Sequence, residues 1–300
     1  MNERLAEVIA EHEFSTRLMG CDAHVSIVHA DGEVARTLFA RAVTVGRTFE
    51  RAFSRFDPAS ELSQLNTRHS MEVSPLFQEA FRFAQQLYRD TGGVFNPLLR
   101  VRVLGYSRTF SEVDNQVVCG DVAYNTDFSA IEFDEARSVI SLQPDQELDF
   151  GGFVKCQATQ AMAEAMQGVD GVVVNVGGDL YVRGADGAGK DFTFSVYDPV
   201  HDRFPLTIPA RDAAVATSGT YRRTWQVGAA RVHHIMQDTR TSAQSDVVSA
   251  TVVHPIGACA DGYATTAVVL GSERGAAFLQ ERQVPFVLIT SQGAVVQRIS

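Results

Sequence analysis

The residues VARTLFARAVTVGRTFERAFSRF, from Val34 to Phe56, carry a periodic pattern that indicates how the chain folds. Apolar side chains recur every three or four residues, at Leu38, Ala42, Val45, Phe49 and Phe53. This spacing places them on one face of an α-helix and predicts a helix that buries the stripe in a core. We expect the helix to end at Phe56-Asp57-Pro58.

Two further segments predict helices. The same spacing recurs from Pro75 to Tyr88, at Phe77, Phe81, Ala84 and Leu87, and Thr91-Gly92-Gly93 follows as a typical helix stop. We expect this helix and the first one to pack in one core. A third helix is predicted after Gly151-Gly152, through Ala158 to Met166, where the glycines would leave backbone amides free to face an anion.

Seven segments rich in β-branched and aromatic residues predict strands. They are Ala23–His29, Val172–Val176, Leu180–Arg183, Phe192–Tyr197, Ala214–Thr217, Val248–His254 and Phe286–Ile289. Helices grouped early and strands grouped late favour an α+β fold. The chain has no internal repeat and no long linker, so residues 1–300 are expected to form a single domain.

Composition excludes some classes of protein. With 300 residues, 45% hydrophobic and 21% charged, the chain is typical of a globular protein with a sizeable core. The formal charge of −10 and the absence of Lys/Arg runs argue against nucleic-acid binding. An anionic ligand would therefore need a metal ion or backbone amides to bind it.

The cysteines and the N-terminal segment bear on redox state and location. Cys21, Cys119, Cys156 and Cys259 are far apart, which suits neither a zinc site nor a disulfide framework, so reduced and mostly buried thiols are expected. Leu18-Met19-Gly20-Cys21 looks like a lipoprotein cleavage box, but the residues before it are highly charged. No stretch approaches the roughly 20 apolar residues that span a bilayer. We therefore expect no membrane insertion and a cytoplasmic location.

Taken one at a time, the polar motifs have simple structural interpretations. Gly177-Gly178-Asp179 is typical of a turn. His233 and His234 are adjacent on an extended segment, so at most one of them would point into a given site. Asp261 and Thr265 have helical i,i+4 spacing, which would place two oxygen ligands suited to Mg²⁺ on one face. Neither glycine pair forms a GxGxxG dinucleotide-binding motif.

The order of these motifs along the chain resembles the ApbE family from Met19 to about Gly271. The matching stretches are Met19-Gly20, FSRFDPASELSQLN (Phe53 to Asn66), GGVFNP (Gly92 to Pro97), LDFGG (Leu148 to Gly152), VNVGGD (Val174 to Asp179), ATSG (Ala216 to Gly219), HHI (His233 to Ile235) and DGYAT (Asp261 to Thr265). The resemblance implies a two-lobed α+β fold with mixed or antiparallel sheets, packed helices and a flavin cleft between the lobes. Residues 1–18 would be an N-terminal lead-in.

The resemblance also implies an activity. In this family FAD binds beside Mg²⁺, and the FMN half is transferred to a threonine hydroxyl on a partner redox protein, with release of AMP. Two alternatives stay open, namely hydrolysis of FAD to FMN and AMP, and an FAD-binding carrier or regulatory protein with weakened catalysis. The sequence does not identify the acceptor, the choice between Mg²⁺ and Mn²⁺, or whether the chain forms homo-oligomers.

Roles for individual residues follow from the same resemblance. His234 would accept the hydroxyl proton. The metal would bind side-chain oxygens of Asp261 and Thr265 and the backbone carbonyl of Val154. Residues expected to contact FAD are Met19, Phe56, Val94, Phe95, Asn96, Gly152, Lys155 and Ile235. Among these, Met19 and Phe56 would touch a ring of FAD, Asn96 would hydrogen-bond FAD, and Gly152 and Lys155 would lie near the pyrophosphate.

The chain departs from the family pattern in two places. The family usually reads His-Ile-Ile-Asp-Pro-Arg-Thr-Gly, whereas here HIMQDTRTS runs from His234 to Ser242, with no proline or glycine and with Asp238 shifted by one position. Cys156 replaces a glycine, and its Cβ is expected to crowd the pyrophosphate or the metal. Both departures fall near the expected reaction centre and keep the carrier alternative open.

Overall fold

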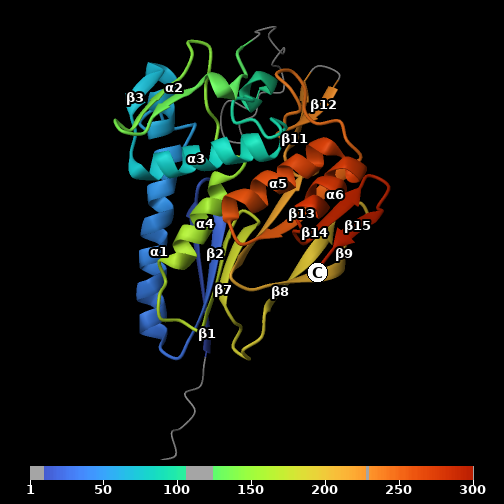
Figure 1. Cartoon of the computed structure of the whole chain (residues 1–300). Helices are drawn as coiled ribbons and strands as arrows, with labels where there is room; N and C mark the ends of the chain where they lie inside the picture. Colours follow the sequence, from blue (N-terminus) through green and yellow to red (C-terminus); the bar gives the residue numbers. More distant parts are fainter. Residues whose placement is uncertain (1–9, 106–123, 228–229, 300) are drawn as a thin grey trace, which may run out of the picture.

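An eight-stranded sheet forms the centre of the structure, and its neighbouring strands are all antiparallel (Figure 1). The computed structural model describes residues 10–105, 124–227 and 230–299. In spatial order the strands are β1 (Ala10–Leu18), β2 (Cys21–His29), β6 (Gly171–Val176), β7 (Asp179–Gly184), β10 (Ala213–Gly219), β13 (Val247–His254), β14 (Phe286–Thr290) and β15 (Val295–Arg298). Six of the seven predicted strands lie in this sheet.

The two faces of the sheet are covered differently. Helices α1 (Gly32–Phe53), α4 (Val154–Glu164), α5 (Gly257–Leu270) and α6 (Ser272–Glu281) lie on one face (Figure 1). The hairpin of β8 (Phe192–Asp198) and β9 (Arg203–Ala210) packs apolar side chains against the other. The predicted α+β class is confirmed. The expected grouping of helices early is wrong, because α5 and α6 lie between β13 and β14 along the chain.

A smaller lobe sits at one end of the sheet and its helices (Figure 1). It contains α2 (Glu61–Arg68), α3 (Pro75–Asp90), the 3₁₀ turns Val101–Leu104 and Phe128–Ala130, and a sheet of β3 (Ser70–Glu72), β5 (Val139–Ser141) and β4 (Glu132–Asp134). A further hairpin pairs β11 (Thr224–Val227) with β12 (Ala230–His233).

A cluster of phenylalanine rings joins this lobe to α1. The Phe53 ring centroid lies 5.5 Å from that of Phe77 and 5.9 Å from that of Phe150, and Phe150 lies 5.1 Å from Phe153. Phe53 belongs to the periodic stripe of α1 and Phe77 to that of α3, and both are buried. The predicted packing of these two helices in one core is confirmed.

Capping explains where α1 begins and ends. The Asp31 side chain accepts hydrogen bonds from the backbone amides of Glu33 and Val34, so the helix begins two residues before the predicted start. It ends at Phe53 because Ser54 is extended and its Oγ accepts from the amide of Phe56. The predicted end at Phe56 is therefore wrong by three residues. Phe56 lies outside the helix and is 45% exposed.

The segment that the sequence assigned to a lead-in contains an edge strand. Residues Ala10–Leu18 form β1, whose residues alternate between half-buried and exposed along most of its length. Cys21, Cys156 and Cys259 are free thiols, the last two buried, and Cys119 lies outside the described residues. A search of the described helices found none long and apolar enough to cross a membrane.

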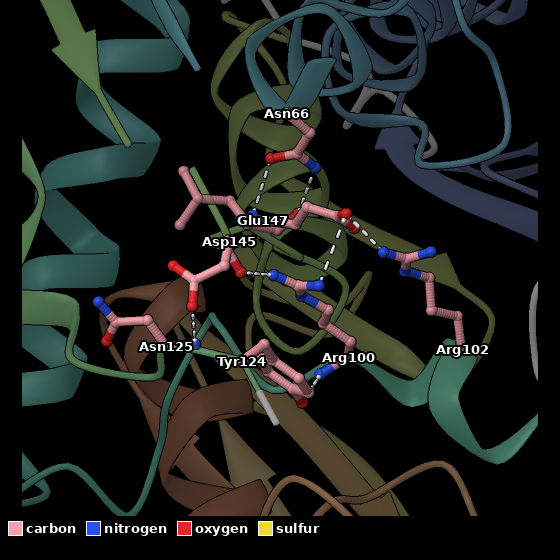
Figure 2. A network of polar contacts seen from close by, with 8 residues as sticks. Asn66, Arg100, Arg102, Tyr124, Asn125, Asp145 and Glu147 are labelled. Carbon is pink, nitrogen blue, oxygen red and sulfur yellow. Dashed lines mark hydrogen bonds and ion pairs between the residues drawn. The ribbon is translucent and has the colours of Figure 1, made fainter. Parts of the chain in front are cut away.

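A polar network ties the loop after Asn96 to the segment that leads into Asp149 (Figure 2). The Arg100 guanidinium donates to the carbonyl of Asp145 and lies 3.6 Å from a carboxylate oxygen of Glu147. The Asn66 amide accepts from the Leu148 backbone N–H at 2.8 Å and donates to its carbonyl at 2.9 Å. These bonds fix the backbone immediately before the Asp-Phe-Gly-Gly stretch.

Candidate functional site

A cleft of about 460 Å³ opens where the two lobes meet, and residues from both lobes line it. All twelve residues assigned to the site from the sequence are among its lining residues: Met19, Phe56, Val94, Phe95, Asn96, Gly152, Val154, Lys155, His234, Ile235, Asp261 and Thr265. The volume is within the range of small-molecule sites. The lining joins an apolar wall to a cluster of charged groups.

The carboxylate of Asp261 faces this cleft from α5, one helical turn before Thr265. Asp261 is 4% exposed, and its Oδ2 is buried without a hydrogen-bond partner among the described residues. Burial raises the pKa of this carboxyl, and the nearby carboxylate of Asp179 raises it further. Thr265 Oγ1 lies 2.7 Å from the hydroxyl of Ser218.

These groups fit a cation. The orphaned oxygen of Asp261 lacks the partner that a buried carboxylate requires, and a metal ion would supply it. Val154 begins α4 and also lines the cleft. The described part of the chain has no group of three His, Cys, Asp or Glu side chains that could hold a metal. The predicted ligand set contains only one carboxylate, with a hydroxyl and a main-chain carbonyl.

α4 and α5 approach closely at one glycine. This contact sets the distance between the predicted metal ligand on α4, Val154, and those on α5, Asp261 and Thr265. A Cβ on Gly257, the first residue of α5, would lie 2.4 Å from the carbonyl oxygen of Cys156 on α4. The Gly257 amide donates to Oε1 of Gln160, also on α4, at 2.8 Å. Only glycine permits this approach.

Lys155 is already paired. Its Nζ donates to Oδ2 of Asp179, which is buried at the start of β7 directly after the predicted Gly177-Gly178 turn. Burial lowers the pKa of Lys155, but the carboxylates of Asp179 and Asp261 more than offset this and hold it above its usual value. The ammonium lines the cleft as predicted, but an aspartate compensates its charge.

The two adjacent histidines have different surroundings. His233 is buried and held by the backbone, since its Nε2 donates to the Ala243 carbonyl at 2.9 Å and its Nδ1 accepts from the Ile235 amide at 3.3 Å. His234 lines the cleft, and its Nδ1 is buried with no partner in the described ranges. Burial and the positive charge of Arg223 lower the pKa of His234 to about 3. As predicted, only one of the pair faces the site, and it is neutral.

The loop after His234 is ordered despite lacking the family's proline and glycine. Asp238 accepts from the amides of Arg240 and Thr241 and from the Thr241 hydroxyl, each at 2.8 Å. The amide of Gln237 donates to the Thr241 carbonyl at 2.9 Å. Asp238 therefore closes the turn by side-chain bonding, which explains how the shifted aspartate can serve here.

The apolar wall combines buried and exposed side chains. Phe95 is 6% exposed, whereas Phe56 is 45% exposed and lies 4.7 Å from the guanidinium carbon of Arg55. Met19 has a positive φ of 52°, and its amide donates to Glu50 Oε1 at 2.8 Å. The strained Met19 backbone is thus held by a helix α1 carboxylate at the rim of the cleft.

Asn96 and Cys156 make contacts that the sequence did not predict. Asn96 Nδ2 donates to the Thr126 carbonyl at 2.9 Å and Oδ1 accepts from the Leu98 amide at 3.0 Å, so this side chain links its own loop to the segment at Thr126. Aspartate could not donate the first bond. Cys156 is fully buried among apolar side chains and does not line the cleft. The prediction that its Cβ crowds the site is wrong, because the side chain points into the core.

Two cleft residues that carry chemistry had no assigned role in the sequence. Ser218 lies in the Ala216–Gly219 stretch that resembles the family, but its contact with Thr265 spans two distant segments. Arg223 lies between β10 and β11, outside every motif that we identified, and it also lines the cleft. No spacing rule would have found Arg223, because a loop brings it to the site.

Comparisons with known proteins point to one family. A family model described as "ApbE family" matches residues 19–288. The chain is 30% identical over 151 residues to an FAD:protein FMN transferase of Vibrio cholerae, covering 49% of this chain and 45% of that one. It is 28% identical to one of Treponema pallidum, covering 69% of this chain and 62% of that one. The chain therefore spans about half of the first relative and less than two thirds of the second.

Solved structures share the fold. An apbe protein from Thermotoga maritima superposes with a TM-score of 0.84 at 21% identity, covering 96% of this chain and 97% of that one. A structure described as flavin transferase ApbE from Vibrio cholerae gives a TM-score of 0.80 at 22% identity, covering 97% of each chain. At these identities the likeness shows the fold.

Proposed function

The chain belongs to the ApbE family, and we propose that it transfers FMN from FAD to a threonine hydroxyl of a partner redox protein, releasing AMP. One observation carries this proposal: a buried carboxylate oxygen of Asp261 and the Nδ1 of a neutral His234, neither with a hydrogen-bond partner among the described residues, share one cleft with an apolar wall. The names of the relatives, FAD:protein FMN transferase, support the same reaction.

The wall and the charged cluster divide the cleft between two parts of FAD. A ring of FAD would lie against Met19, Phe56 and Phe95, since an apolar wall excludes water from a planar ring. The pyrophosphate would then lie near Gly152 and Lys155. A Cβ on Gly152 would come within 3.0 Å of the Phe95 ring, so this position favours glycine.

Asp261 and Thr265, with the main-chain oxygen of Val154, would hold the metal, for which we propose Mg²⁺. A bound Mg²⁺ supplies charge neutralisation on the phosphate oxygens. Asp261 must be ionised to bind it, although burial and the Asp179 carboxylate raise the pKa of its carboxyl. The Thr265 hydroxyl can donate to Ser218 and still offer a lone pair.

His234 would act as the general base. The acceptor threonine Oγ attacks the FMN-side phosphorus, an O–P bond forms, the bond to the bridging oxygen breaks, and AMP leaves with the electron pair. The hydroxyl proton passes to Nδ1 of His234, the unpartnered nitrogen. The positive charges of Arg223 and Lys155 help to keep this imidazole a weak base, and the anionic pyrophosphate would offset them and raise its pKa.

The two departures from the family pattern do not weaken this proposal. Asp238 orders the loop after His234, and Cys156 lies in the core and away from the cleft. The grounds for a carrier with weakened catalysis are thereby reduced. Hydrolysis of FAD would use the same residues with water as acceptor, and the experiment below separates it from transfer.

The test is to incubate the protein with FAD and Mg²⁺, with and without a threonine-containing acceptor domain. AMP is measured by chromatography and covalent flavin by in-gel fluorescence. We expect AMP and covalent flavin only when the acceptor is present. AMP with free FMN would indicate hydrolysis, and intact bound FAD would indicate a carrier. The control His24→Ala, an exposed histidine outside the cleft lining, should behave as wild type.

A further inference from the structure

Arg223 is a cation in the cleft that forms no ion pair with a described carboxylate. Its guanidinium Nη2 lies 3.7 Å from the Sγ of Cys21, another lining residue. No carboxylate in the described ranges lies within ion-pairing distance of it. Arg223 is partly buried, and arginine side chains that lose contact with water usually bind an acid or an anion.

The two other cations that line the cleft differ in this respect. Arg55 is ion-paired with Asp149 at 3.0 Å. Lys155 is ion-paired with Asp179, so its charge is largely compensated before any ligand binds. Asp261 adds a second carboxylate near Lys155. Its negative charge further reduces the positive charge that Lys155 can offer to an anion. Among the described lining residues, Arg223 is therefore the cation whose charge is not compensated by an ion pair.

Arg223 also lies centrally among the reacting groups. Its charge lowers the pKa values of His234, Lys155 and Asp261. An arginine that influences all three must lie close to the place where metal, base and phosphate would meet. The planar guanidinium presents a fork of N–H donors that matches phosphate oxygens.

We propose that Arg223 is a substrate-binding and catalytic residue that donates hydrogen bonds to the pyrophosphate of the bound dinucleotide. This inference rests on the proposed function, in which FAD is the substrate. When the acceptor oxygen bonds to the FMN-side phosphorus and the bridging P–O bond breaks, the leaving AMP takes the electron pair. Arg223 stabilises the negative charge that this step places on the AMP phosphate.

The neighbouring residue Arg222 provides a matched control. Arg222 is exposed, and its guanidinium lies 5.8 Å from the Tyr221 ring centroid. It does not line the cleft. The two arginines have the same charge and are adjacent in sequence, so they contribute equally to the net charge. Only their access to the cleft differs.

The experiment measures the binding of ADP, which carries a diphosphate without a flavin, by isothermal titration calorimetry in metal-free buffer. Arg223→Gln should weaken ADP binding by about 10- to 100-fold, the loss expected for a hydrogen-bonded charge. Arg223→Lys should recover part of the affinity, and Arg222→Gln should bind as wild type. ADP affinity that is unchanged in Arg223→Gln, or lowered equally in Arg222→Gln, overturns the proposal. The proposal is also overturned if Arg223→Gln and Arg223→Lys both lower the thermal unfolding midpoint as well as the affinity for ADP.

Activity then separates this inference from the proposed function. If wild type releases AMP in the presence of the acceptor, Arg223→Gln should lower kcat by more than ADP affinity alone explains. An active wild type with an equally active Arg223→Gln overturns the inference and leaves the function intact. If wild type binds ADP through Arg223 but releases no AMP, the proposed transfer is wrong, and the anion-binding role of Arg223 is upheld.

Discussion

Replacement of Gly257 by alanine should separate the two halves of the proposed metal site. The new Cβ would lie 2.4 Å from the carbonyl oxygen of Cys156, whereas ordinary contact begins near 3.4 Å. The two nearest atoms, the carbonyl oxygen and carbonyl carbon of Cys156, belong to the backbone, so no side chain can swing away. The helices must therefore move apart by about 1 Å at this point.

The displacement has a cost in both stability and activity. Overpacking of this kind typically costs about 1–3 kcal/mol of unfolding free energy. α4 carries Val154 and Lys155, and α5 carries Asp261 and Thr265, so the same shift moves the proposed ligands relative to each other. A misplacement of about 1 Å lowers rates by about 10²-fold when it reaches a reaction centre.

The assay follows AMP release against Mg²⁺ concentration and the unfolding midpoint in parallel. Gly257→Ala should raise the Mg²⁺ needed for half-maximal rate and lower kcat while the protein stays folded at the assay temperature. Gly187→Ala is the control, because a Cβ there meets nothing within 4 Å. If Gly257→Ala loses stability but keeps the wild-type rate and Mg²⁺ dependence, the spacing of these helices does not position the site.

Three other outcomes follow from the contacts described. His234→Gln should lower AMP release by about 10²- to 10⁴-fold, the range for loss of a general base, with FAD binding retained in a fluorescence titration; an unaltered rate would remove His234 from the mechanism. The pKa of His234 is about 3 in the folded protein and near 6.5 in the unfolded chain. Between pH 3 and pH 6.5, His234 therefore binds a proton in the unfolded chain but stays neutral in the folded protein. The unfolding midpoint of the wild type should therefore fall as pH drops from 6.5 toward 3, and that of His234→Gln should fall less. If the two proteins show the same dependence of unfolding midpoint on pH, this prediction is wrong. Asn96→Asp removes the donor to the Thr126 carbonyl and should cost about 1–3 kcal/mol in urea unfolding, and equal stability would show that this bond is not needed.

The parts of the fold that were predictable are those where burial imposes a pattern. The stripe of α1 and the β-branched central strands follow this rule, because each buries a face against the core. β1 was missed because most of its residues are half-buried or exposed, and β15 because it is a short strand paired only with β14. The end of α1 was missed because it depends on one hydrogen bond beyond the helix, from the Phe56 amide to the Ser54 hydroxyl.

The sequence predicted which residues line the cleft, but not the contacts that they make there. Twelve residues named from a family resemblance all reach one cleft, which no local pattern could have established. What those side chains do there depends on tertiary contacts. The Lys155–Asp179 pair joins α4 to β7, the Asn96 amide bonds to a loop thirty positions away, and Cys156 turns toward the core. None of these contacts is encoded in spacing along the chain.

The cleft takes its lining from almost the whole length of the chain, beginning at Met19 and ending at Val269 on α5. A ribosome-bound chain that lacks α5 has neither Asp261 nor Thr265, so the assembly of the site is a late event in the synthesis of the molecule. Dinucleotide binding should therefore report on the completion of folding, and flavin fluorescence quenching should lag behind the burial of the phenylalanine cluster during refolding. The formation of the cleft is in this way coupled to the pairing of segments far apart in the chain, which is slow in folds dominated by non-local contacts.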